Sequence, residues 1–131
     1  MPTPSELSFV KTFIDAARQE RYLYFLTSTK GRAKLRASLG DLRDLNWSIC
    51  GKIEPNLQNV ESILNILRKN GARPLCHIIS ESKKLDDKEM SLNTALREVV
   101  GLGIGTVIIC VPDKLAYYEG EGKGERYLCL K

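Results

Sequence analysis

Basic residues concentrate in the first third of the chain, around a Ser-Thr-Lys-Gly-Arg stretch at residues 28–32. From residue 18 to residue 43 there are seven cations and two acids, whereas the whole chain carries a net charge of only +4. If Ser28 or Thr29 caps a helix, the free N–H groups and the dipole at its start would attract a phosphate. The candidate anion-binding residues are Lys30, Gly31, Arg32, Lys34 and Arg36.

Two tyrosines precede this basic stretch, and either Tyr22 or Tyr24 could stack on a base beside the cations. The partner that this combination predicts is a nucleic acid or a nucleotide. The stretch is not a P-loop, because Gly-x-x-x-x-Gly-Lys-[Ser/Thr] is absent. The alternative interpretation is that these lysines and arginines only solvate the outer face of an amphipathic helix.

A second group of polar residues follows two nearly continuous apolar runs, at residues 75–79 and 107–111. Runs without polar alternation are typical of strands covered on both faces, as in parallel pairs. Parallel strands would place the ends of both runs at one edge of the sheet, where ligands gather in α/β folds. The predicted ligand rim consists of Ser80, Glu81, Ser82 and Asp113.

Two carboxylates on such a rim could hold a divalent cation or act as acid and base. This second hypothesis is a small metal-dependent hydrolase or phosphoesterase, nuclease-like, with Glu81 and Asp113 as weak catalytic candidates. The plain alternative is that Asp86-x-x-Glu89 or Ser91 caps the next helix and that the rest is solvated loop. A Pro-Asp…Glu-x-Lys pattern at residues 112–123 imitates metal nucleases, but about 26 Å of strand would separate its two carboxylates.

His77 is the only histidine and a further weak catalytic candidate. Its neighbour Cys76 would point to the opposite face of a strand, so these two cannot form a nucleophile pair. We interpret His77 as a hydrogen-bonded core residue, and the cysteines as buried free thiols without the spacing of metal ligands. We therefore predict no cofactor and no metal, except for a divalent cation under the hydrolase hypothesis.

The glycine-rich stretch at residues 101–106 resembles a dinucleotide fingerprint but follows a helix and precedes a strand, which is the reverse of the required order. A helix C-cap and turn explain these glycines. Apolar spacing predicts helices near residues 5–17, 29–42, 57–67 (capped by Asn56) and 92–100. Residues 22–26 fit a helix or a strand, and we favour the helix. Strands are expected at residues 75–79, 107–111, 115–119 and 126–130, and a short edge strand or an extended loop at residues 47–53.

These elements predict one α/β domain over residues 1–131, with a helical, basic part at 1–45 and a sheet-forming part at 46–131. The sheet would be small and mixed, a βαβ unit continued by C-terminal antiparallel hairpins, with the helical half packed on it. The last strand could be an exposed edge that pairs with a second copy. The sequence shows neither a secretion signal nor a membrane span, which predicts a cytoplasmic protein. The leading hypothesis is a non-catalytic binding or regulatory module for an anionic partner.

Overall fold

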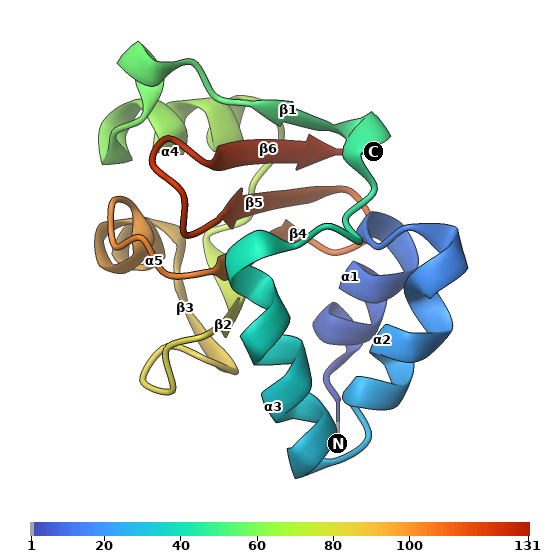
Figure 1. Ribbon diagram of the computed structural model, residues 1–131. Coiled ribbons are helices and arrows are strands. Elements are labelled where there is room, and N and C mark those ends of the chain that lie inside the picture. Colours follow the sequence, from blue (N-terminus) through green and yellow to red (C-terminus); the bar gives the residue numbers. More distant parts are fainter. Residues whose placement is uncertain (1) are drawn as a thin grey trace.

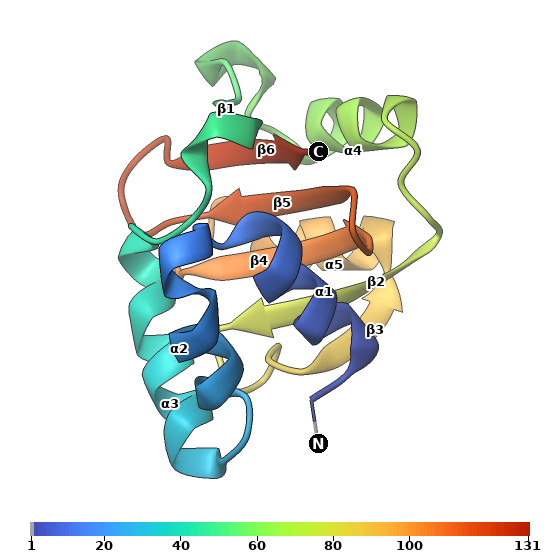
Figure 2. The same cartoon turned by 90° about the vertical axis from the view of Figure 1, so that its right-hand side faces the viewer.

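A six-stranded antiparallel sheet is the middle layer of the fold, and helices cover both of its faces (Figures 1 and 2). The computed structural model describes residues 2–131. One face carries Ile79, Val107 and Ile109, which pack against the N-terminal helices. The other face carries Ile78 and Ile108, which pack against two later helices. The expected α/β class with a helical half packed on an open sheet is confirmed.

The helices and strands follow one another in the order shown in Figure 1. The α-helices are α1 (Pro4–Phe13), α2 (Gln19–Phe25), α3 (Thr29–Ser38), α4 (Val60–Lys69) and α5 (Leu92–Val99). The strands are β1 (Cys50–Lys52), β2 (Leu75–Ser80), β3 (Lys88–Ser91), β4 (Thr106–Val111), β5 (Leu115–Glu119) and β6 (Arg126–Leu130). Short 3-10 turns are η1 (Ala16–Arg18), η2 (Leu39–Asp41), η3 (Trp47–Ile49) and η4 (Pro55–Leu57).

Side-chain caps explain where the helices begin. Ser28 accepts a hydrogen bond from the backbone of the third residue after it, so α3 starts as the sequence predicted. Ser91 caps α5 in the same way, in agreement with the plain interpretation of that loop. Helix α4 is capped by Asn59, not by Asn56, because residues 55–57 form a 3-10 turn first. The ambiguous aromatic run at 22–26 belongs to helix α2, as favoured, with Phe25 its last residue.

The sheet has the order β1-β6-β5-β4-β2-β3, and every neighbouring pair is antiparallel. The expectation of a parallel pair at 75–79 and 107–111 is therefore wrong: β2 and β4 are adjacent but run in opposite directions. The cause is strand β3, which the sequence analysis missed. It returns the chain to the start of β2, so that α5 runs back along the sheet and β4 begins beside Ser80. Because β3 adds one more passage of the chain along the sheet, β4 runs in the direction opposite to the one expected.

The prediction that the last strand is an edge is also wrong. Strand β6 lies between β5 and β1, with Cys129 directly opposite Cys50 of β1. The edges are β1, which has three residues, and β3, which carries Lys88 and Glu89 on its exposed surface. Short or charged edges disfavour pairing with another sheet. The expected self-association through residues 126–130 therefore has no free edge to use.

Candidate functional site

The backbone at the start of helix α3 forms its hydrogen bond within the protein. The backbone N–H of Gly31 donates to the Ser28 hydroxyl over 2.9 Å, and Gly31 is buried. A Cβ atom at this position would lie 2.6 Å from the carbonyl oxygen of Phe25 at the end of α2. The glycine therefore permits the close approach of α2 and α3, and its N–H is not free for a phosphate.

Both of the predicted anion-binding arginines, Arg32 and Arg36, point toward the sheet. Arg32 Nη2 lies 2.6 Å from Glu6 Oε2 on α1, and Arg32 Nε lies 2.8 Å from Asp86 Oδ2. Arg36 donates to the backbone oxygens of Ser80 (3.0 Å) and Glu81 (2.6 Å) at the end of β2. Both guanidinium groups therefore connect α3 to the sheet and its neighbouring loop rather than to an external partner.

The remaining cations of this region are on the outer surface. Lys30 and Lys34 are exposed on α3, and Arg21 is exposed on α2 with its guanidinium 5.4 Å from the ring centre of Phe25. Tyr24 on α2 is 71% exposed, the largest value among the exposed large hydrophobic side chains of the described residues. Arg21, Tyr24, Lys30 and Lys34 are thus exposed on two helices that pack together, and we refer to these four residues as the outer basic face. Tyr22, by contrast, is buried, and its hydroxyl donates to Asp44 over 2.8 Å.

The predicted rim residues do not share an edge. Ser80 pairs with Thr106 in the register of β2 and β4, and its hydroxyl lies 2.8 Å from that of Thr106. Asp113 follows β4 at the other end of the sheet, where it accepts a hydrogen bond from Ser8 over 2.6 Å. Strands of this length place the two ends on the order of 20 Å apart. Glu81 and Asp113 therefore cannot hold one cation, whereas Ser82 remains beside Ser80, since its N–H donates to the Ser80 hydroxyl.

Glu81 instead meets a second carboxylate that the sequence analysis did not assign. Its Oε1 accepts a hydrogen bond from the backbone of Gly105 over 3.2 Å. A Cβ atom on Gly40 would lie 2.6 Å from that oxygen and 2.2 Å from Glu121 Oε1. Burial raises the pKa of Glu81, and the hydrogen bond with Glu121 and the negative charge of Glu121 raise it further. A pair of this kind favours holding one proton between its two carboxyl groups.

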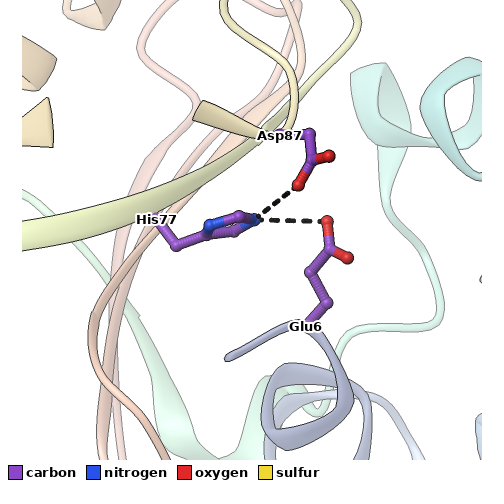
Figure 3. Close-up of side chains that lie close together, drawn as sticks. All are labelled: Glu6, His77 and Asp87. Atoms are coloured by element: carbon purple, nitrogen blue, oxygen red, sulfur yellow. Dashed lines mark hydrogen bonds and ion pairs between the residues drawn. The ribbon is translucent and has the colours of Figure 1, made fainter. Parts of the chain in front are cut away.

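A third group joins the N-terminal helix to the sheet, as Figure 3 shows. His77 Nε2 lies 3.2 Å from Glu6 Oε2 and 3.3 Å from Asp87 Oδ1. His77 is buried on β2, Glu6 is 1% exposed in the first turn of α1, and Asp87 lies in the loop before β3. His77 is thus a buried, hydrogen-bonded residue, as interpreted from the sequence, and its partners are two carboxylates.

The Glu6 carboxylate is held in its charged form. Burial alone would raise its pKa, but hydrogen bonds from His77 and Arg32 and the charge of Arg32 outweigh burial and lower the pKa to about 2. Thr3 fixes the same side chain through a capping box, in which the Thr3 N–H donates to Glu6 Oε1 over 3.2 Å. The Thr-x-x-Glu spacing was the signal that could have revealed Glu6 from the sequence.

The surroundings of the cluster define what it can do. One imidazole nitrogen and two carboxylate oxygens from three separate elements converge, and this combination can share a proton or hold a cation. His77 also borders a pocket of about 430 Å³, lined in part by Ser5, Arg73 and Glu89. Most of the other residues that line this pocket are apolar, and neither Glu6 nor Asp87 is among them.

No protein-family model, curated protein or solved structure matches this chain. Within residues 2–131, no helix combines the length and the apolar character needed to cross a bilayer.

Proposed function

We propose that this protein is a non-catalytic binding module whose outer basic face contacts a phosphate-bearing partner, with single-stranded nucleic acid as the class that fits best. The observation that carries the proposal is the exposure of the Tyr24 ring, 71%, on the helix that packs against α3 with its two outward lysines. Exposed aromatic rings beside cations are how proteins bind single strands without reading their sequence.

The charge of this surface supports the same conclusion. Lys30, Lys34 and Arg21 have no carboxylate within 4 Å among the described residues, whereas Arg32 is paired with Glu6 and Asp86. Phosphates can therefore approach these three cations without first breaking an internal ion pair. Each phosphate contact to a single strand releases bound counterions, which makes the affinity depend on salt.

The test is fluorescence anisotropy of a labelled oligo(dT) with the full chain over a series of salt concentrations. We expect the logarithm of the affinity to fall linearly with the logarithm of salt, with a slope of about −0.7 per phosphate contact. Replacing both Lys30→Gln and Lys34→Gln should reduce the slope by about 1.4, because two contacts are removed. Tyr24→Ala should weaken binding by about 1–3 kcal/mol with little change in slope.

The matched control is Lys69→Gln, an exposed lysine on α4, which covers the opposite face of the sheet. Its affinity and slope should equal those of the wild type. Binding that does not depend on salt, or that survives the double lysine substitution unchanged, would remove the proposal. A mononucleotide that competes as well as the oligonucleotide would point to a nucleotide instead of a strand.

The structure separates the two carboxylates on which the hydrolase hypothesis depended. That hypothesis required Glu81 and Asp113 at one edge of the sheet, and the antiparallel register of β2 and β4 places them at opposite ends. The function proposed above does not depend on either residue.

A further inference from the structure

We propose that Glu6, His77 and Asp87 form a binding site for one divalent transition-metal ion, with Zn²⁺ as the ion that suits the ligands best. This site is separate from the outer basic face. It concerns the inner side of the N-terminal layer, where α1 meets β2.

The spacing of the three ligand atoms fits a metal. His77 Nε2 lies 3.2 Å from Glu6 Oε2 and 3.3 Å from Asp87 Oδ1, and all three atoms lie within 4.8 Å of one another. Ligand atoms bound tetrahedrally to zinc at about 2.0–2.1 Å are separated by about 3.3 Å. Figure 3 shows both carboxylates directed at the same nitrogen, so an ion could be inserted with small side-chain movements.

The site is supported by neighbours that fix its ligands. Arg32 donates to Glu6 Oε2 over 2.6 Å, and the capping box with Thr3 holds the other oxygen of the same carboxylate. An ionised carboxylate offers about four lone-pair positions, so these contacts leave Glu6 able to bind a metal as well. Outer contacts of this kind orient metal ligands in known sites.

The backbone at Asp87 also favours a specific role for its side chain. Asp87 has φ of 59°, in the left-handed region that glycine adopts without strain. Its N–H donates to the backbone oxygen of Ile78 over 2.9 Å, which holds the loop against β2. The aspartate at this position places a carboxylate oxygen 3.3 Å from His77 Nε2. Its left-handed backbone costs free energy that a glycine would not lose.

The net charge of the cluster is negative, which favours binding of a cation. Three carboxylates (Glu6, Asp86 and Asp87) face two guanidinium groups (Arg32 and Arg36), so the group carries one net negative charge when the histidine is neutral. The side chain of Asp87 is 55% exposed, which gives an ion access from solvent. The imidazole nitrogen favours a transition metal over Mg²⁺ or Ca²⁺, which prefer all-oxygen sites.

The experiment is isothermal titration calorimetry of the full, chelator-treated chain with ZnCl₂, MnCl₂ and MgCl₂. We expect one Zn²⁺ per chain, weaker binding of Mn²⁺, and weaker binding still of Mg²⁺. Asp87→Asn should lower the Zn²⁺ affinity by at least about 100-fold, since even outer-contact substitutions cost about 10- to 100-fold. Asparagine tolerates the left-handed backbone, so this variant should keep its fold.

The matched control is Asp113→Asn. Asp113 is the other non-glycine residue with a positive φ (67°) among the described residues, and it lies outside the cluster. Its Zn²⁺ affinity should equal that of the wild type. A variant with Cys50→Ser and Cys129→Ser should also bind as the wild type does.

Three results would overturn the proposal: no Zn²⁺ binding by the wild type, unchanged binding by Asp87→Asn, or loss of binding in the cysteine variant. The last result would assign the zinc to thiols instead. None of these titrations contains nucleic acid, so their failure leaves the proposed function of the outer basic face unaffected.

Discussion

Tyr117 and Glu119 lie two residues apart on β5, and the Tyr117 hydroxyl donates a hydrogen bond of 2.7 Å to Glu119 Oε1. Both residues are buried. The same carboxylate accepts from the backbone of Gly101 (3.3 Å) and Gly103 (3.2 Å) and from Arg126 Nε (3.2 Å). The glycine-rich turn that resembles a nucleotide fingerprint therefore binds an internal carboxylate.

Removing one of these donors should destabilise the fold. Tyr117→Phe keeps the ring but takes a hydrogen bond from a buried charge, and we expect a loss of about 1–3 kcal/mol in the free energy of unfolding. The matched control is Tyr127→Phe, because the Tyr127 hydroxyl contacts the less buried Glu125 and should cost about 0.5 kcal/mol. Urea unfolding of both variants measures the difference, and equal losses would contradict this account.

The Glu81–Glu121 pair makes the stability depend on pH. Because the pKa of Glu81 is raised in the folded state, the folded chain binds more protons than the unfolded chain above the ordinary glutamate pKa. Stability should therefore fall as the pH rises from the ordinary glutamate value through the raised one. Glu121→Gln removes the neighbouring charge and should stabilise the protein at pH 7 by roughly 0.5–1 kcal/mol.

The gain from Glu121→Gln should vanish at acid pH, well below the ordinary glutamate pKa, because the Glu81 carboxyl, whose pKa is raised, is then uncharged in the wild type as well. Thermal unfolding of wild type and variant at pH 7 and at the acid end checks this. A variant that is less stable than the wild type at pH 7 would show that the two carboxylates do not repel each other.

Gly105 tests how closely the chain packs at the same end of the sheet. A Cβ atom there would lie 2.3 Å from the backbone carbon of Leu39 and 2.4 Å from the backbone nitrogen of Gly40. Backbone cannot move away as a flexible side chain can, so Gly105→Ala should cost about 1–3 kcal/mol or more. Gly51 in β1 has no atom within 4 Å of such a Cβ. Gly51→Ala should be neutral or stabilising by about 0.5–1 kcal/mol; similar unfolding midpoints for the two variants would refute the argument.

The internal role of Arg32 gives the largest expected effect. Arg32→Ala takes the guanidinium away from Glu6 and leaves Asp86 with only the more distant Arg36 (3.7 Å), and breaking a buried pair costs about 3–5 kcal/mol. The comparison is Arg43→Ala, whose partner Asp41 is 77% exposed at the side chain and whose loss should cost less than about 1 kcal/mol. Chemical denaturation distinguishes them, and a mild Arg32→Ala variant would mean that water already replaces the ion pairs.

Local signals predicted most of the elements but not their arrangement. The two apolar runs became β2 and β4 because β-branched residues fit a strand covered on both faces. Strand β3 (Lys88–Ser91) was missed because an edge strand is charged and exposed and therefore reads as a loop. Because β3 crosses the sheet between β2 and α5, β4 runs antiparallel to β2; a direct connection from β2 to α5 predicts the parallel direction instead.

The candidate site was predicted only in part. His77 was named, but Glu6 and Asp87 come from segments that the sequence does not show to be neighbours. Whether Arg32 and Arg36 point inward depends on which side of α3 faces the sheet. The inward arginines and the outward lysines alternate on one helix, so the sequence alone does not distinguish them. Contacts between elements decide which residues become neighbours and which way a side chain points, whereas periodicity describes only one helix at a time.

The pairing of β1 with β6 has a consequence for synthesis on the ribosome. Cys50 faces Cys129, so β1 must wait for its partner until most of the chain has been translated. The apolar side of α1–α3 likewise rests on strands that are made later. The N-terminal helices would therefore emerge from the ribosome with their apolar side uncovered, and this surface is prone to aggregation until the strands are made.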